Sequence, residues 1–341
     1  MKIYKFLKLN KNLASTLRNV QTLSTLVLFL FVLSFPVQAI LLKETTPPRT
    51  FSDWCLNKAN LSLETKRTVD VLLQMAETQD CSQADKLLSA RTKLVLKNNQ
   101  IVDLKPLSTL TSLNVLYLEN NQIADLKPLS TLPNLYELLL GSNQITDVKS
   151  LSTLTSLNVL HLGSNQIADL KPLSTLPNLA KLYLGSNQIA DLKPLSTFPN
   201  LVELLLGNNS IVDLKPLSTL TSLNVLYLGN NSIVDLKPLS TLLNLYELVL
   251  GSNQITDLKS LSTLTSLNIL HLGSNQIVDL RPLSTLTNLT KLYLGNNPIA
   301  DSKPLSTLTN LTELYLVNNQ TLVDKTCPVK PTSICKFMRS R

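Results

Sequence analysis

The fold is decided by a stretch of 22 residues, 113–134, which reads LNVLYLENNQIADLKPLSTLPN. Around Leu116 and Leu118 the apolar residues alternate, which is the period of a β-strand. Seven positions of the stretch are leucine or isoleucine: 113, 116, 118, 123, 126, 129 and 132. One such unit cannot bury all seven side chains, but stacked units can share one continuous core. The stretch therefore predicts a solenoid in which the equivalent strands of successive units pair in parallel.

An asparagine marks the same point of every unit. It recurs every 22 residues, at Asn99, Asn121, Asn143, Asn165, Asn187, Asn209, Asn231, Asn253, Asn275, Asn297 and Asn319. An asparagine side chain carries both an amide donor and a carbonyl acceptor, so a stacked column can satisfy the backbone groups of successive turns. We therefore expect this column to be a structural ladder and not a ligand site.

The pattern LxxLxLxxNxIxDLxPL, repeated in register over about residues 91 to 323, resembles the leucine-rich repeat. It is similar in particular to the 22-residue type of bacterial internalin-like proteins. The resemblance implies an α/β fold, a right-handed curved solenoid with 3₁₀ or irregular segments on its convex side. On the concave side it implies a parallel β-sheet of about eleven strands, one for each repeat.

The regions outside the repeats have compositions of their own. Residues 1–39 combine a basic start, an apolar run and the small-residue site Val37-Gln-Ala39, which is the pattern of a signal peptide. This segment predicts an exported protein, secreted or periplasmic, without a membrane span after signal removal; an uncleaved membrane anchor is the alternative. The expected segments are a signal peptide at 1–39, a linker at 40–50, a helical N-terminal cap at 51–90 with a helix over 63–76, repeats at 91–323, and a C-terminal cap and tail at 324–341.

Four cysteines agree with export, because disulfides persist outside the cytoplasm. Cys55 and Cys81 precede the repeats, and Cys327 and Cys335 follow them. Eleven stacked strands at about 4.8 Å place the two ends about 50 Å apart, whereas bridged Cα atoms lie within about 7 Å. We therefore expect the disulfides Cys55–Cys81 and Cys327–Cys335. A metal site is less favoured, since neither pair has a nearby histidine or a second pair of cysteines.

The charge of the chain gives no indication of nucleic-acid binding. The formal net charge is +8, but five bases and no acid lie in residues 1–39, which leaves 26 bases against 23 acids. No stripe of basic residues runs along the repeats, and such a stripe is the usual sign of a nucleic-acid partner.

Nothing in the sequence predicts a catalytic, metal or cofactor site. His161 and His271 occupy equivalent positions, about 24 Å apart at five strand spacings, which is too far to share a metal ion. Glu137 and Glu203 lie three strands apart, at about 14 Å, which is wider than a glycosidase pair requires. We therefore expect a protein that is not an enzyme and that carries no cofactor.

The residues that vary between units are the strand residues that point away from the core. They combine tyrosines with scattered charges, a composition typical of binding surfaces. We interpret the chain as a non-catalytic exported scaffold whose concave face recognises a protein or a glycan. The candidate ligand-binding residues are Val115, Tyr117, Glu137, Leu139, His161, Lys181, Tyr183, Glu203, Tyr227, Glu247, His271, Lys291, Tyr293, Glu313 and Tyr315.

A block of five units occurs twice. Residues 112–199 match residues 222–309 at 72 of 88 positions, which predicts two related half-surfaces about 24 Å apart. Recent copying would explain the match without any ligand.

Two other functions remain open: a regulatory subunit that clamps an enzyme, as in a phosphatase regulator with a similar 22-residue repeat, and architectural self-association. The oligomeric state is not indicated.

Overall fold

The computed structural model describes residues 48–337, and these lie in one compact unit. The expected signal peptide at 1–39 and most of the expected linker at 40–50 lie outside the described residues. Within residues 48–337, no helix is both long enough and apolar enough to cross a membrane.

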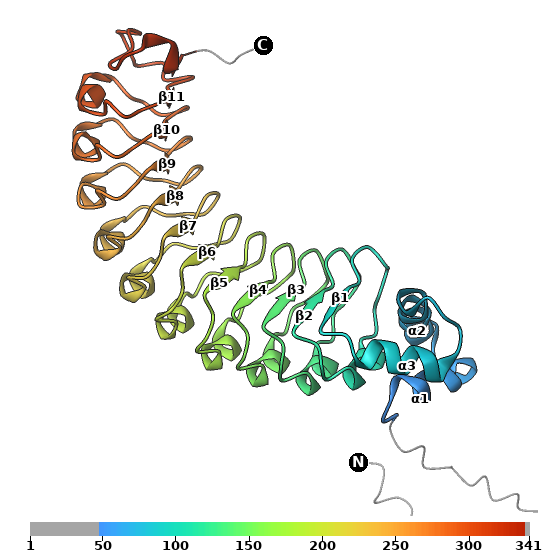
Figure 1. The fold of residues 1–341 in the computed structure, drawn as a ribbon. Coiled ribbons are helices and arrows are strands. Elements are labelled where there is room, and N and C mark those ends of the chain that lie inside the picture. Colours follow the sequence, from blue (N-terminus) through green and yellow to red (C-terminus); the bar gives the residue numbers. More distant parts are fainter. Residues whose placement is uncertain (1–47, 338–341) are drawn as a thin grey trace, which may run out of the picture. The chain divides into compact units, whose positions relative to one another are not determined.

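Three short helices precede the repeats: α1 (Phe51–Leu56), α2 (Leu63–Ala76) and α3 (Cys81–Ser89). Their starts follow from capping side chains, because Ser62 accepts a hydrogen bond from the third residue of α2 and Asp80 does the same for α3. The helix expected over 63–76 is confirmed. The helices lie beside β1 at one end of the sheet (Figure 1), and the Cys55–Cys81 disulfide joins α1 to α3.

The repeats and the following segment form one parallel sheet of twelve strands in sequence order. The predicted solenoid is confirmed, and the strand beyond the expected eleven is β12, which pairs with β11 after the last repeat. The strands are β1 (Lys93–Val95), β2 (Val115–Tyr117), β3 (Glu137–Leu139), β4 (Val159–His161), β5 (Lys181–Tyr183), β6 (Glu203–Leu205), β7 (Val225–Tyr227), β8 (Glu247–Val249), β9 (Ile269–His271), β10 (Lys291–Tyr293), β11 (Glu313–Tyr315) and β12 (Cys335–Lys336).

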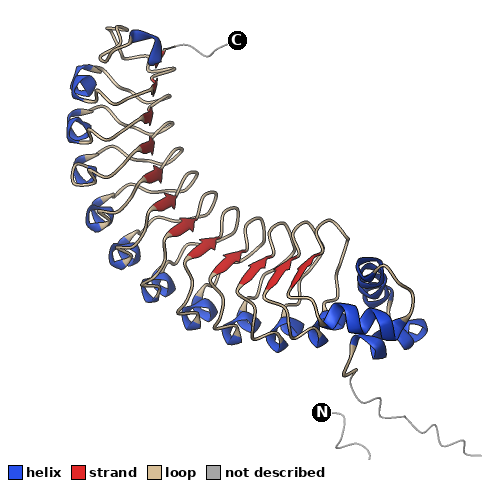
Figure 2. Cartoon of the chain, in the orientation of Figure 1, coloured by secondary structure: helices blue, strands red, loops and turns tan. Residues whose placement is uncertain are grey.

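A 3₁₀ helix lies on the outer side of each coil, so that the strands line the inner side of the curve (Figure 2). Asp125 stabilises the start of one such 3₁₀ helix, because its carboxylate accepts a hydrogen bond from the Lys127 N–H at 2.8 Å. A proline follows within the first turn. The 3₁₀ helices are η1 (Lys58–Asn60), η2 (Lys105–Thr109), η3 (Lys127–Thr131), η4 (Lys149–Thr153), η5 (Lys171–Thr175), η6 (Lys193–Thr197), η7 (Lys215–Thr219), η8 (Lys237–Thr241), η9 (Lys259–Leu261), η10 (Arg281–Thr285), η11 (Lys303–Thr307) and η12 (Thr332–Ile334).

The core is a set of parallel columns of leucine and isoleucine. In the unit that decides the fold, Leu116, Leu118, Ile123, Leu129 and Leu132 are all completely buried. Each of these side chains packs against its equivalents in the coils before and after it, so burial depends on stacking, as the sequence predicted. The second disulfide, Cys327–Cys335, closes the segment that ends in β12, and both predicted pairings are confirmed.

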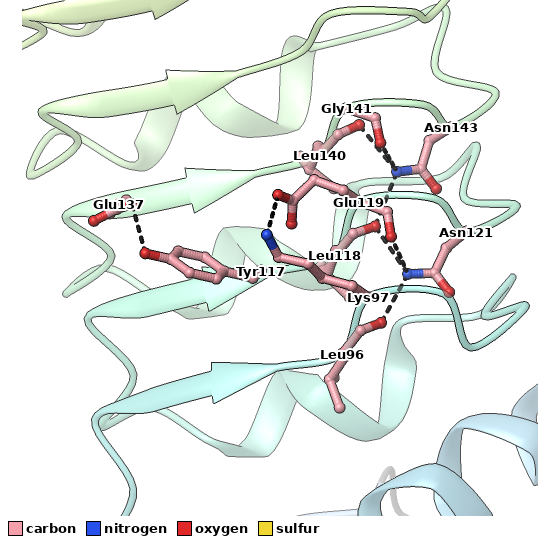
Figure 3. Close-up of polar contacts among 10 residues, drawn as sticks. All are labelled: Leu96, Lys97, Tyr117, Leu118, Glu119, Asn121, Glu137, Leu140, Gly141 and Asn143. Atoms are coloured by element: carbon pink, nitrogen blue, oxygen red, sulfur yellow. Dashed lines mark hydrogen bonds and ion pairs between the residues drawn. The ribbon is translucent and has the colours of Figure 1, made fainter.

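The asparagine column lies where each chain turns away from its strand. Asn121 donates through Nδ2 to the carbonyls of Leu96 and Leu118 at 2.9 and 2.8 Å (Figure 3). Its Oδ1 accepts from the N–H of Ile101 at 3.0 Å. One side chain therefore satisfies backbone groups of its own coil and of the preceding coil, which is the use that the sequence indicated.

Candidate functional site

The concave side of the sheet presents the first and third residue of each strand. In β2 to β11 these two residues are half-buried while the middle one is fully buried. In the described part of the chain, no helix lies over this side of the sheet (Figure 2). All candidate ligand-binding residues occupy these positions, and their contact with a ligand remains a prediction.

Four tyrosines of this face donate hydrogen bonds to glutamates of the following strand. Tyr117 bonds Glu137 at 2.8 Å (Figure 3), and the other three pairs, Tyr183–Glu203, Tyr227–Glu247 and Tyr293–Glu313, have distances of 2.5, 2.6 and 2.7 Å. These residues were predicted from the sequence as separate contacts, and their pairing was not predicted. The available signal was a glutamate 20 residues after each tyrosine, which is a diagonal neighbour one strand away.

These bonds fix both partners of each pair. Burial and the bond to Glu247 raise the pKa of Tyr227 to about 12, and burial with the bond to Glu203 raises the pKa of Tyr183 as well. The hydroxyls therefore stay protonated near neutral pH and remain donors. The tyrosines are less free than the sequence suggested, because their rings are half-buried and their hydroxyls are already bonded.

Lysines neutralise some of the glutamates. Lys181 lies 2.7 Å from Glu203, and Lys291 lies 3.3 Å from Glu313. Burial works to raise the pKa of Glu203, but the hydrogen bonds and charge of its partners outweigh burial and lower it. Between residues 48 and 337, Glu137 and Glu247 form no ion pair within 4.0 Å.

The two histidines lie in different surroundings although their positions are equivalent. Glycines recur every 22 residues shortly after the strands, from Gly141 to Gly295, and form a column. The ring of His161 lies over the first two of them, because a Cβ on Gly141 would come within 2.7 Å of the ring and one on Gly163 within 2.9 Å. It meets Tyr183 edge-on, with ring centroids 5.7 Å apart and an interplanar angle of 80°. His271 instead stacks on Tyr293 at 3.9 Å and 15°. Burial lowers the pKa of both histidines.

A depression of about 480 Å³ lies over β3 to β6. It is lined by the outward side chains of these four strands: Glu137, Leu139, Val159, His161, Lys181, Tyr183 and Leu205. Its volume falls within the range of about 300–1,000 Å³ that is common for ligand sites. Among the described residues, no three histidine, cysteine, aspartate or glutamate side chains gather closely enough to hold a metal ion.

Comparisons with known proteins agree with this architecture. The family described as Leucine Rich repeats (2 copies) matches residues 92–131, 111–154, 133–174, 155–197, 199–241, 243–285 and 287–327. No curated protein matches the chain in sequence.

Solved structures with the same fold include bacterial and plant proteins. An internalin of Listeria monocytogenes is 33% identical, with a TM-score of 0.65 over 74% of this chain and 82% of the internalin. A leucine-rich repeat protein of Leptospira interrogans is 27% identical, with a TM-score of 0.50 over 72% of this chain and 81% of its own. A plant peptide hormone receptor, solved in complex with RGF2, is 21% identical and shares the fold, with a TM-score of 0.55 over 68% of this chain and 44% of the receptor. Because the matched segments cover well over half of its length, the chain belongs to the leucine-rich repeat family, and its repeats are internalin-like.

Proposed function

We propose that the protein is an exported, non-catalytic scaffold that binds a protein partner through the concave face of its sheet. The leucine-rich repeat fold is in general a binding scaffold, and the internalin-like repeats support this class of function. Export is supported by the two disulfides, which are rare in cytoplasmic proteins, and by the signal-like composition of residues 1–39.

One observation carries the choice of the concave face. Its side chains vary in chemistry from strand to strand, yet they are held in place by a regular lattice of backbone pairs and by the four tyrosine–glutamate bonds. A surface whose side chains are already ordered loses little further conformational entropy on binding. Such preorganisation favours recognition by rigid shape complementarity.

The test compares two variants of the purified protein in the capture of partners from the source organism's culture medium and envelope extract. The first variant, Leu139→Glu with Leu205→Glu, alters two half-buried positions of the concave face, whose side chains lie outside the leucine core. The matched control, Lys127→Glu with Lys193→Glu, changes two exposed positions of the convex 3₁₀ helices. Circular dichroism establishes that both variants fold.

We expect the wild type and the convex control to retain the same partner, identified by mass spectrometry, and the concave variant to lose it. Retention by the concave variant with loss by the convex control would overturn the proposal and place the binding surface on the 3₁₀ side. Export is tested separately by locating the protein in cell fractions, where a cytoplasmic protein with reduced cysteines would contradict it.

A further inference from the structure

The depression over β3 to β6 combines apolar walls with a polar margin. Leu139, Val159 and Leu205 are half-buried and lie on three of its four strands. Apolar side chains in a concave surface gain contact area when a partner's apolar side chain displaces water from them. In protein interfaces, such pockets near the centre of the contact receive the few side chains that carry most of the binding energy, above all tryptophan, tyrosine and arginine.

The duplicated block provides an internal comparison for this depression. Tyr315 stands in β11 where Leu205 stands in β6, and its ring stacks on Tyr293 at 4.9 Å and 20°. The space that Leu205 leaves beside Tyr183 is therefore taken by an aromatic ring in the second block. The two blocks share their histidine, lysine and glutamate, so the open space distinguishes the first block.

The charges around the depression favour a cationic group. Glu203 is compensated by Lys181 at 2.7 Å, but within the described residues no cation lies within 4.0 Å of Glu137. Tyr117 donates to one carboxylate oxygen of Glu137 and so holds the group at the margin of the depression. The rim therefore carries one negative charge that the protein itself does not neutralise.

Exposed apolar side chains also precede two strands of the depression. Tyr136, immediately before β3, is 50% exposed, and Val202, immediately before β6, is 38% exposed. The equivalent positions of the second block are Tyr246 and Thr312, so only the first block carries an apolar residue at both places. At these two positions the first block is thus the more apolar one.

We infer that the depression over β3 to β6 is the anchor point of the binding face, and that it receives an aromatic side chain next to a lysine or arginine of the protein partner. This inference rests on the proposed function. The aromatic ring contacts Leu139, Val159 and Leu205, and the cation pairs with Glu137. The second block, whose space is filled by the stacked tyrosines, is not the anchor.

The two histidines make a direct test possible, because they are the only ones in the chain and each belongs to one block. The imidazole signals of the protein, labelled with ¹³C on histidine, are assigned with a His271→Gln variant. Three capped dipeptide amides serve as probes in NMR titrations: tryptophan–arginine, tryptophan–glutamate and alanine–arginine. The variants are Glu137→Gln and, as the matched control in the second block, Glu247→Gln.

We expect the tryptophan–arginine probe to shift the His161 signals with a dissociation constant on the order of millimolar, and to leave those of His271 in place. The tryptophan–glutamate probe should bind about threefold to fivefold more weakly, as for one partly exposed ion pair, and the alanine–arginine probe more weakly still. Glu137→Gln should remove the preference for arginine over glutamate, whereas Glu247→Gln should keep it.

The inference is overturned if both histidines respond equally, if the tryptophan probes show no charge preference, or if no probe shifts His161. These results leave the proposed function standing when the concave variant described above still loses its partner, because Leu139 and Leu205 then contact the partner through chemistry other than an aromatic ring beside a cation. If instead that variant keeps the partner, the part of the concave face around Leu139 and Leu205 is excluded as the binding surface.

Discussion

The two matching stretches, residues 112–199 with β2 to β5 and residues 222–309 with β7 to β10, share most of their sequence but hold their histidines differently. In the first copy the ring lies across the glycine column and meets Tyr183 edge-on, and in the second copy it stacks on Tyr293. The strand register is the same in both copies. The difference therefore comes from neighbouring side chains and not from the backbone.

Several substitutions between the copies lie near the two histidines, beginning with Leu139, which pairs with His161 where Val249 pairs with His271. Tyr315 supports Tyr293 from one side, which leaves the other face of that ring for His271, whereas Leu205 offers no ring for stacking. Glu119 stands at the start of the glycine column near His161, and its charge favours the protonated imidazole, while glycine occupies the equivalent position 229. A repeated scaffold can thus present two different surfaces through a few outward residues.

The largest expected effect concerns the asparagine ladder, which both copies share. Asn165 and Asn275 are equivalent, and each donates to two buried carbonyls and accepts from one isoleucine N–H at 2.9 to 3.1 Å. Asn165→Ala and Asn275→Ala should each reduce the free energy of unfolding by roughly 2–4 kcal/mol, because buried backbone groups lose their partners. Urea unfolding of the two variants measures this, and we expect the two losses to agree within about 0.5 kcal/mol.

Asn158 provides the control for this prediction. Its side chain donates to one carbonyl, that of Asn178, in an exposed contact, so Asn158→Ala should cost less than about 1 kcal/mol. If Asn165→Ala were as mild as this control, the asparagine column would not be the main support of the turns. Clearly unequal losses at Asn165 and Asn275 would show that the scaffold, and not only the surface, differs between the copies.

Exchanging the residues at positions 205 and 315 should exchange the geometries of the two histidines. Tyr315→Leu removes one stacked pair and should lower the free energy of unfolding by about 1 kcal/mol, since such a pair contributes about 0.5–1.5 kcal/mol beyond its buried area. It should also release His271 from its stack on Tyr293. Leu205→Tyr should produce the reverse change, closing the depression and bringing His161 into a stacked position. Chemical shifts of the two imidazoles and a structure of each variant measure these changes.

If Leu205→Tyr left the His161 signals unchanged, the residue at this position would not determine the histidine geometry. Glu119 and Leu139, which pairs with His161 where Val249 pairs with His271, would then be the differences to examine. Tyr315→Phe serves as the matched control, because it keeps the ring and the stack and should leave His271 in place.

The fold could be predicted from the sequence because every unit repeats the same spacing of buried residues. A residue such as Leu116 needs only its equivalents in the neighbouring coils to be buried, so spacing alone defines the core, the strand register and the asparagine ladder. The disulfides followed from the length of the stack. β12 was missed because Cys335 and Lys336 lie outside the repeat pattern and pair through the backbone only.

The candidate face was harder to predict, because its details depend on side-chain directions between strands. The positions of Tyr183 and Glu203 on the face were predicted, but their hydrogen bond was not. It joins the last residue of one strand to the first residue of the next, whereas aligned units show only residues directly opposite each other. The different orientations of His161 and His271 could not be predicted either, because the strand register is the same in both copies and only the side chains around the rings differ.

The smallest expected effect is a difference in protonation between the two histidines. Burial lowers the pKa of both below the usual value of about 6.5, and in the first copy Glu119 partly opposes burial. Glu119→Gln should therefore lower the pKa of His161 further and leave that of His271 unchanged, which NMR titration of the two imidazoles measures.

The sign of the effect on stability follows from linkage. Because the folded pKa of each histidine lies below its unfolded value, the unfolded chain binds more protons between the two values, and stability decreases as the pH falls through that window. Glu119→Gln widens the window for His161 and should make this decrease slightly steeper, whereas Lys97→Gln should narrow it, since the charge of Lys97 lowers the pKa of His161. An equal pKa change at His271 in either variant would contradict the local origin of the shift, because that histidine is surrounded by Glu247, Glu313 and Lys291 instead.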